Sequence, residues 1–423
     1  MAYILKGATC YIDGEFTKMD VAVQGETIVQ VSPSIEAGSE DTLLNLDGML
    51  LMPGFVDVHV HLREPGMSYK ETIATGTAAA ARGGYTSVIS MPNLSPAPDS
   101  VENLRVQLDL IEKSAVVEVI PTGAITLGQM GEGELVDFKA LSARVAGFSD
   151  DGRGVQSGEL MLQAMLQAKQ AGKPIIAHCE DEALLHGGYI HDGEYCKANG
   201  HKGICSESEW GQLKRDLELV EQTGVQYHMC HLSTKESVEL IREAKAKGLK
   251  VSCETAPHYL LLTDDDLQES GRFKMNPPIR SREDQVAIIE GVLDGTIDVI
   301  ATDHAPHSFE EKAKGLAKSA FGIVGIETAF PLLYTYLVKR GVVSLERIAQ
   351  MMCDTPRSLF GLEQVTIKEG NRADIVVINT DCSYEIDPAD FASMGEATPF
   401  EGWEVKCATH LTMVKGELNY YKK

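Results

Sequence analysis

The chain has 423 residues, of which 43% are hydrophobic and 24% are charged, and this composition argues against a disordered protein. Its formal net charge of −24 argues against nonspecific binding to nucleic acid or to an anionic membrane, because both require a basic surface. Nine cysteines without a CxxC pair, no signal-peptide pattern and no long apolar run predict a cytoplasmic protein.

Short apolar runs at both chain ends predict β-strands separated by turns. The expected strands cover residues 3–5, 9–12, 21–24 and 27–31 near the N-terminus and residues 373–378, 408–414 and 417–421 near the C-terminus. Neither end alone has enough strands for a stable core. We therefore expect residues 1–52 and 363–423 to combine into one small β-sandwich domain.

Between these ends, residues 53–362 alternate apolar runs with helical patterns. Eight strands are expected, at residues 54–61, 86–91, 116–125, 145–148, 174–178, 225–231, 250–255 and 298–302. Helices are expected between several of them, at residues 159–171, 207–223 and 235–247. This alternation is typical of α/β proteins, and eight parallel strands predict a closed (β/α)₈ barrel of the TIM type. A doubly wound open sheet is the alternative.

Two histidines lie two positions apart at the end of the first of these strands, in the sequence Asp57-Val58-His59-Val60-His61. Because side chains alternate between the faces of a strand, His59 and His61 project to the same side. Two imidazoles placed in this way can bind one metal ion. An HxH pair on its own is often incidental, so whether this pair binds a metal ion depends on polar residues elsewhere in the chain.

Polar residues also end four further expected strands. His178 and His231 close two of them, Asp303 follows a third, and Asp150 and Asp151 follow a fourth. Barrel strands converge at their carboxyl ends, so these side chains predict a metal site. They exceed the ligands of one catalytic zinc, which favours two ions about 3.5–4 Å apart. Neighbouring cations need an anionic bridge, and either aspartate is placed to provide it.

Three segments resemble the signatures of a known family. Residues 59–66 (HVHLREPG) and 301–307 (ATDHAPH) resemble the two metal-binding signatures of dihydroorotases. Residues 148–152 (FSDDG) are similar to the class I segment in which the second aspartate bridges the metals; hydantoinases, allantoinases and class II dihydroorotases use a carboxylated lysine instead. The resemblance spans nearly the whole chain and implies the amidohydrolase fold, a barrel with a composite β domain.

The resemblance also implies a set of site residues. Two Zn²⁺ ions are expected, bridged by Asp151 and a hydroxide, with His59, His61 and Asp303 on one ion and His178 and His231 on the other. The residues expected to contact substrate are His61, Arg63, Asn93, Asn276, His307, Phe321 and Gly322. Arg63 and Asn93 would hold a carboxylate, which suits the two-pronged geometry of a guanidinium.

The implied reaction is the reversible hydrolysis of the cyclic amide of dihydroorotate to carbamoyl aspartate, in pyrimidine biosynthesis. The hydroxide would attack the ring carbonyl, and Asp303 would accept its proton and return it to the departing nitrogen. Another cyclic amidohydrolase, such as an allantoinase or hydantoinase, is the enzymatic alternative. A silent scaffold that binds aspartate transcarbamoylase is the alternative from another class. A homodimer is expected from the family only.

Several residues have no clear role at this stage. Asp150 could support the site or form a turn, and His258 is expected to be structural or to support the ligands. His304 should point away from the metals. Residues 186–205 contain histidines and cysteines at spacings that match no zinc pattern, so we expect a solvated excursion. Residues 308–320 could form a lid or an ordinary surface loop.

Overall fold

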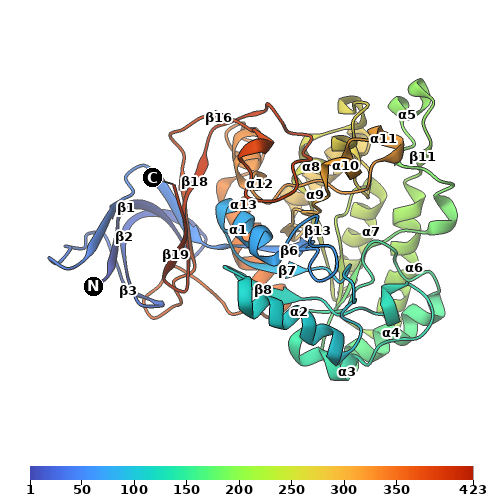
Figure 1. The fold of residues 1–423 in the computed structure, drawn as a ribbon, viewed down its shortest axis with the longest axis horizontal. Coiled ribbons are helices and arrows are strands. Elements are labelled where there is room, and N and C mark those ends of the chain that lie inside the picture. Colours follow the sequence, from blue (N-terminus) through green and yellow to red (C-terminus); the bar gives the residue numbers. More distant parts are fainter. Residues whose placement is uncertain (423) are drawn as a thin grey trace.

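The computed structural model describes residues 1–422, and strands from both chain ends form one sheet in it. The strand order is β19-β18-β15-β5-β1-β2-β3, with β4 paired to β1. Figure 1 shows the N-terminal strands beside β18 and β19 at one end of the molecule. The bounds are β1 Tyr3–Ile12, β2 Glu15–Gln24, β3 Thr27–Ser32, β4 Thr42–Asn45, β5 Met49–Pro53, β15 Ile375–Asn379, β18 Ala408–Val414 and β19 Glu417–Tyr421.

The two chain ends meet at the pairing of β5 with β15. These strands run antiparallel, with Pro53 opposite Ile375, so the expected pairing of the chain ends is present. The first two expected strands are one strand, β1, whose pairing with β2 shifts register between Leu5 and Ala8. Gly7 lies in this irregularity with φ of 80°, and a Cβ there would come within 2.5 Å of an Asp47 oxygen.

The central part of the chain forms parallel pairings that close into a ring. The strands are β6 Phe55–Val60, β7 Tyr85–Ser90, β8 Glu118–Pro121, β9 Ile175–Ala177, β12 Tyr227–Met229, β13 Val251–Thr255 and β14 Val299–Ile300. They pair in the orders β6-β7-β8 and β9-β12-β13-β14. Parallel bridges from Phe148 to Gly123 and Ile175 join β8 to β9, and a bridge between His304 and Val60 closes the circle. A doubly wound open sheet, the alternative considered from the sequence, would lack this closing bridge.

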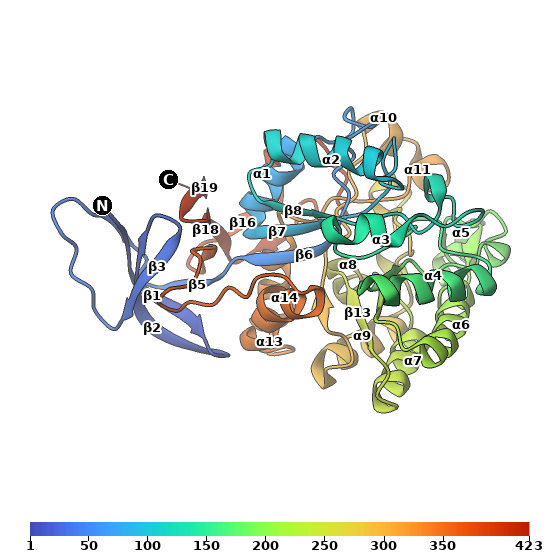
Figure 2. The same cartoon turned by 90° about the horizontal axis from the view of Figure 1, so that it is seen from below.

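Helices surround the ring, and Figure 2 shows α4, α6, α7 and α9 side by side along one part of it. The longer helices are α1 Ile73–Gly83, α2 Val101–Ser114, α4 Gly158–Ala171, α6 Glu207–Thr223, α7 Lys235–Ala246 and α9 Arg282–Asp294. The shorter ones are α3 Phe138–Leu141, α5 Glu194–Asn199, α8 Pro257–Leu261, α10 Phe309–Lys312, α11 Gly315–Lys318, α12 Ala329–Leu333, α13 Leu345–Ala349 and α14 Thr355–Phe360. Two short strand pairs, β10 Ile190–His191 with β11 Gly203–Ile204 and β16 Tyr384–Glu385 with β17 Glu404–Val405, lie outside the ring. The three expected helices match α4, α6 and α7 to within one residue at each end.

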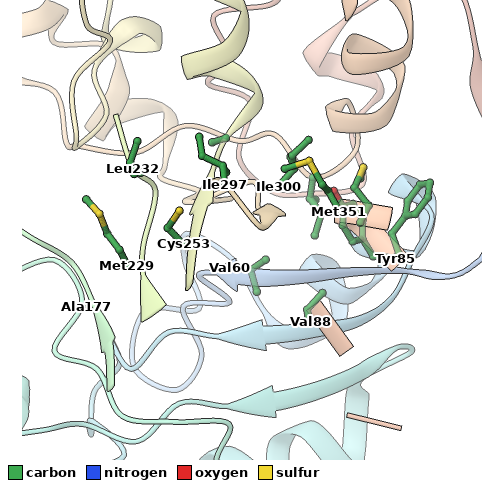
Figure 3. Packing of buried hydrophobic residues seen from close by; sticks show 14 of the residues in the cluster. Val60, Tyr85, Val88, Ala177, Met229, Leu232, Cys253, Ile297, Ile300 and Met351 are labelled. Carbon is green, nitrogen blue, oxygen red and sulfur yellow. The ribbon is translucent and has the colours of Figure 1, made fainter. Parts of the chain in front are cut away.

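Alternating side chains of the ring strands build two separate hydrophobic clusters. Ile176 of β9 belongs to a cluster formed only by segments of the ring and by residues near α14, whereas its neighbours Ile175 and Ala177 pack with the surrounding helices. Figure 3 shows the outer cluster, to which β7 contributes Val88 and β12 contributes Met229. This period of two is the one expected of strands that are buried on both faces.

Two expectations about local structure need correction. Residues 145–148 occupy the expected place in the ring but form no regular strand; Phe148 forms isolated bridges, and the Ala146 N–H donates to the Pro121 carbonyl oxygen. Residues 186–205 are mostly exposed or half-buried, as expected of a solvated excursion, but Ile190 and Cys196 are buried in a cluster with Leu262 and Phe273 and anchor the segment. No helix within residues 1–422 is long and apolar enough to cross a membrane.

Acid should loosen the segment 186–205 through His191. Burial, together with the nearby Arg280 cation, lowers the pKa of His191 from 6.5 to about 4. The native state therefore holds a neutral imidazole, while the unfolded chain takes up a proton near its ordinary pKa. The stability that His191 contributes is complete above pH 6.5 and is lost as the pH falls towards 4. Hydrogen-exchange protection of β10 and β11, corrected for intrinsic rates, should fall over this range.

Two variants test the source of this effect. His191→Leu should remove the pH dependence of protection, because leucine does not titrate. His186→Asn, at an exposed position of the same segment, should keep it. Constant protection of wild-type β10 and β11 between pH 7 and pH 4.5 would contradict the assignment to His191.

Candidate metal centre

His59 and His61 both reach one point at the carboxyl end of β6. The pairing of β6 with β7 shifts register between Asp57 and Val60, a bulge of the kind that redirects side chains next to functional sites. His59 Nε2 lies 3.5 Å from an oxygen of Asp151, and His61 Nε2 lies 3.6 Å from the other oxygen. The expectation that the two imidazoles share one side is confirmed.

His178 and His231 approach the same Asp151 carboxylate as His59 and His61. His178 Nδ1 lies 3.6 Å and His231 Nε2 lies 3.7 Å from Asp151 Oδ1, and the two ring nitrogens are 2.9 Å apart. Ligand atoms of His59, His61 and Asp151 form one converging group, and those of Asp151, His178 and His231 form another. Asp151 is the member that the two groups share, which is the arrangement expected of a bridging carboxylate.

Asp303 completes the cluster. Its Oδ1 lies 3.1 Å from His61 Nε2 and 3.6 Å from His59 Nε2. Burial opposes ionisation of this carboxyl, but the hydrogen bond from His61 and the charge of His59 outweigh it, and its pKa is lowered to about 2. Burial acts in the same way on Asp151, and the surrounding histidines hold its pKa well below the ordinary value. Both side chains are therefore carboxylates at neutral pH.

Backbone strain accompanies three of the predicted residues. Asp303 has φ of 48°, His231 has φ of 29° and Arg63 has φ of 60°, in the left-handed region that non-glycine residues seldom adopt. By the alternation of β12, in which Cys230 faces the inside of the ring, His231 would face outwards. Its backbone conformation returns it to the site. Such strain gathers at functional sites, where it is compensated by the surrounding structure.

Glu254 is a site residue that the sequence analysis missed. It is fully buried on β13, and its Oε1 accepts a hydrogen bond from His59 Nδ1 at 2.6 Å. Its Oε2 accepts one from His228 Nε2 at 3.0 Å, and the His231 backbone N–H donates to Oε1 at 3.2 Å. The contact fixes the proton of His59 on Nδ1 and leaves the lone pair of Nε2 for a cation. Its position near a strand end was the signal that could have identified it.

The donor set fits divalent cations. His59 Nε2 and Asp151 Oδ1 are buried atoms that have no hydrogen-bond partner, although they lie among the other converging groups. Neutral imidazole nitrogens together with carboxylate oxygens are the ligands that zinc accepts, and related first-row metals accept them as well. The residues of either converging group can therefore hold a divalent metal.

A cavity of about 170 Å³ opens beside this cluster. All seven residues predicted to contact substrate line it, namely His61, Arg63, Asn93, Asn276, His307, Phe321 and Gly322, together with Asp151, His178, His231 and Asp303. Gly322 has φ of 128°, and a Cβ there would come within 2.7 Å of the Ala305 carbonyl oxygen. Glycine is thus needed at this wall of the cavity.

Arg63 and Asn93 supply hydrogen-bond donors to the cavity. Arg63 is buried; its Nε donates to the Pro306 carbonyl oxygen at 3.1 Å and its Nη2 lies 3.2 Å from His307 Nε2, which leaves the other guanidinium hydrogens for a ligand. Asn93 Nδ2 donates to the Asp151 carbonyl oxygen at 2.6 Å and retains its second hydrogen. A planar anion is the natural ligand of such a pair of donors.

Glu180 is a second residue that the sequence analysis missed. Its Oε1 accepts a hydrogen bond from Asn276 Nδ2 at 2.8 Å, and its Oε2 lies 3.6 Å from His178 Nε2. Since a carboxylate only accepts, the amide group of Asn276 must face Glu180 with its nitrogen. The Asn276 Oδ1 atom is then the acceptor that remains for a ligand.

The structure shows the contacts of the residues whose role was unclear from the sequence. The Asp150 carboxylate accepts hydrogen bonds from the backbone of Ile125, Thr126 and Gly131 and therefore holds turns together. His304 Nε2 lies 3.7 Å from a Glu71 oxygen, and His304 belongs to neither converging group and does not line the cavity, in agreement with the prediction. His258 is buried and has an unpartnered Nε2, in contact with the Tyr259 ring.

The segment 308–320 is firmly attached to the wall of the cavity. Lys312 is buried, and its ammonium donates to the carbonyl oxygens of Lys274, Ala320 and Gly322 at 2.6–3.0 Å. Three donors thus meet three acceptors. Ser308 and Glu311 cap α10 reciprocally at the start of the segment. The segment is an ordered cap beside His307.

Comparison with known proteins agrees with this geometry. An L-hydantoinase (dihydropyrimidinase) from Arthrobacter aurescens superimposes with a TM-score of 0.88 at 25% identity, covering 99% of this chain and 96% of that one. The fold and the site define the class of cyclic amidohydrolases.

Closer relatives narrow the class to a family. The family described as dihydro-orotase-like matches residues 48–237. Dihydroorotases from Anoxybacillus flavithermus and Staphylococcus aureus are each 48% identical to this chain, over 97% and 99% of its length and over 96% and 99% of their own. The chain belongs to the dihydroorotase family.

Proposed function

We propose that this chain is a cytoplasmic dihydroorotase, which reversibly hydrolyses the cyclic amide of dihydroorotate to carbamoyl aspartate in the biosynthesis of UMP. One observation carries the proposal: a buried guanidinium, that of Arg63, shares a cavity of about 170 Å³ with the converging ligand atoms. A ring that carries both a carboxylate and a hydrolysable amide matches these two features. Relatives with the dihydroorotase name support the same conclusion.

We also propose how the architecture and the cofactors serve this reaction. The closed ring is a (β/α)₈ barrel over residues 53–362, and residues 1–52 and 363–423 make up a composite β domain centred on the one sheet that their strands form, in place of the expected β-sandwich. His59, His61 and Asp303 would hold one Zn²⁺, His178 and His231 the other, and Asp151 would bridge them. Bound zinc supplies Lewis acidity, which activates water and polarises the amide carbonyl.

The substrate would be oriented by groups at opposite walls of the cavity. Arg63 and Asn93 bind the carboxylate through their free donors. Asn276 Oδ1, whose orientation Glu180 sets, accepts from a ring N–H. The backbone of Phe321 and Gly322 lies beside the ring, with His307 next to it. These contacts fix the ring so that its amide carbonyl faces the metal ligands, and fixing it in this way lowers the entropic part of the barrier.

Asp303 moves the proton. As a carboxylate it accepts the proton of the attacking water while the new C–O bond forms. It then donates the same proton to the ring nitrogen as the C–N bond breaks, so that atoms and charges balance. The reverse sequence of steps closes the ring of carbamoyl aspartate.

The proposed function is tested by turnover of dihydroorotate by the zinc-loaded protein, after chelation and after zinc restoration. Metal-dependent hydrolysis of dihydroorotate, with no turnover of allantoin or dihydrouracil, is expected. Turnover of an uncarboxylated ring alone would identify a hydantoinase-like enzyme instead. A protein that retains both metals and turns over none of these rings would be the silent scaffold.

Replacing Arg63 should mainly weaken substrate binding. Arg63→Ala removes the donors for the carboxylate and leaves the metal ligands in place, so KM should rise by about 100-fold or more, as expected for lost charge-assisted hydrogen bonds. Arg63→Lys should recover little, because an ammonium lacks the two-pronged geometry. Steady-state kinetics with dihydroorotate measures both effects, and an unchanged KM for Arg63→Ala would remove the carboxylate role.

Two proposals about partners come from the family and the charge. The net charge of −24 supports a small-molecule substrate and argues against nucleic acid or an anionic membrane as partners. A homodimer, and an association with aspartate transcarbamoylase, are proposals that rest on the family alone. Sedimentation of the protein by itself and mixed with the transcarbamoylase tests both.

A further inference from the structure

We propose that Lys70 is a positioning residue, which determines which ring nitrogen of His307 carries the proton. This inference rests on the proposed function, in which His307 contacts the substrate ring. Lys70 is 9% exposed and does not line the cavity. Its ammonium lies 3.2 Å from His307 Nδ1 and 2.9 Å from a Glu311 oxygen. Lys70 therefore touches His307 from behind.

The shortest contacts of His307 favour one tautomer. An ammonium can only donate a hydrogen bond, so Lys70 at 3.2 Å favours His307 Nδ1 as an acceptor. The carbonyl oxygen of Phe321 can only accept, and it lies 2.7 Å from His307 Nε2. Two longer contacts act in the opposite sense: Arg63 Nη2, a donor, lies 3.2 Å from Nε2, and a Glu311 oxygen, an acceptor, lies 3.5 Å from Nδ1. The shorter contact at each nitrogen places the proton of the neutral imidazole on Nε2, with Lys70 as the group that outweighs Glu311.

This tautomer fixes one wall of the cavity. His307 and Phe321 both line the cavity, whereas Lys70 lies outside it. The Nε2–H group donates to the Phe321 carbonyl oxygen at 2.7 Å, and this bond holds the imidazole and the backbone of Phe321 beside the proposed position of the substrate ring. Burial, with the cations Arg63 and Lys70 nearby, lowers the pKa of His307 to about 3, so the imidazole stays neutral at physiological pH. Fixing the tautomer is then the means by which the chain fixes this contact.

Glu311 holds Lys70 in place. It lies on α10 and is itself held by the reciprocal cap with Ser308. A carboxylate here offsets the charge of an ammonium that otherwise faces Arg63 and Lys312. The segment 308–320 thus contributes to the site indirectly, through the charge of Glu311 on Lys70.

The experiment compares zinc-loaded wild-type protein with Lys70→Met and Lys70→Arg. The nitrogen-15 signals of His307, identified from a His307→Gln spectrum, report the tautomer. Wild type should show the proton on Nε2 only, and Lys70→Met should show a mixture of both tautomers. The KM for dihydroorotate should rise by about tenfold in Lys70→Met, with kcat and bound zinc little changed, as expected for one weakened hydrogen bond. Lys70→Arg should recover most of the wild-type tautomer signal and most of the wild-type KM.

Controls separate the proposal from general damage. Lys18→Met removes an exposed lysine that pairs with Asp47 in the terminal sheet, and it should change neither readout. Glu311→Gln removes the carboxylate that faces His307 Nδ1 and keeps the lysine, so its proton should stay on Nε2; a shift towards Nδ1 in this variant would contradict the proposal even if Lys70→Met does not fold. A wild-type proton on Nδ1, or an unchanged tautomer and KM in Lys70→Met, would overturn the proposal. The tautomer signal needs no turnover, so failure of the proposed activity is distinguishable from failure here.

Discussion

Asp303→Asn should fold and retain most of its metal but lose about 10³-fold or more in kcat. Asparagine preserves the size of the side chain and an oxygen near His61, but it cannot accept and return a proton. General acid–base catalysis typically contributes about 10²–10⁴-fold, and Asp303 serves both directions of transfer here. Its position 3.1 Å from His61 Nε2, at a strained backbone with φ of 48°, allows little adjustment by a neighbouring group.

The measurement is steady-state turnover of dihydroorotate, together with elemental analysis and near-ultraviolet circular dichroism. Asp265→Asn, at an exposed position, is the matched control and should behave as wild type. If Asp303→Asn kept more than about a tenth of the wild-type kcat with full metal content, the proton would have to travel by another group.

Asp151→Ala should deplete metal from both positions, whereas the loss of any other single ligand should affect mainly one. The reason is geometric: Asp151 is the only residue of the described chain that belongs to both the group with His59 and His61 and the group with His178 and His231. Its removal also leaves two neighbouring cations without an anion between them. Apparent zinc affinity should fall by more than about 100-fold, above the range seen when only a supporting contact is lost.

Elemental analysis after dialysis against a graded zinc buffer measures this affinity. His178→Ala is the informative comparison, since it removes a ligand from one group only and should leave about half of the wild-type zinc. Full retention of zinc by Asp151→Ala would exclude it as the bridge. Loss of zinc from only one of the two positions in Asp151→Ala would show that Asp151 is a terminal ligand of that position and not the bridge.

His178 and Asp303 could be predicted because side chains alternate along a strand, so that their direction follows from their position in the sequence. His178 continues the inward-facing alternation beyond Ile176, and Asp303 continues it beyond Ala301. The same reasoning predicted the ring of strands and the pairing of the chain ends. Where the local pattern determines the position of a residue in the fold, the sequence was sufficient to predict that position.

Residues that act through another side chain could not be predicted in this way. Glu254, Glu180 and Lys70 matter because of atoms brought to them from distant parts of the chain, such as His59 for Glu254, 195 positions away. The irregular segment 145–148 was taken for a strand because its apolar pattern reflects burial alone. His231 was predicted as a ligand from its place after a strand, but the unusual φ that brings it to the site could not be read from a residue pattern.

The pairing of β5 with β15 has a consequence for how the protein is made. On a ribosome, the strands of residues 3–53 emerge long before residues 375–379, the partner of β5. Until the last part of the chain is synthesised, one edge of the nascent sheet has unpaired N–H and carbonyl groups, and such edges readily bind other chains. Contacts this distant in sequence also form slowly. Chaperone contact during translation should therefore concentrate on the first fifty or so residues until synthesis ends.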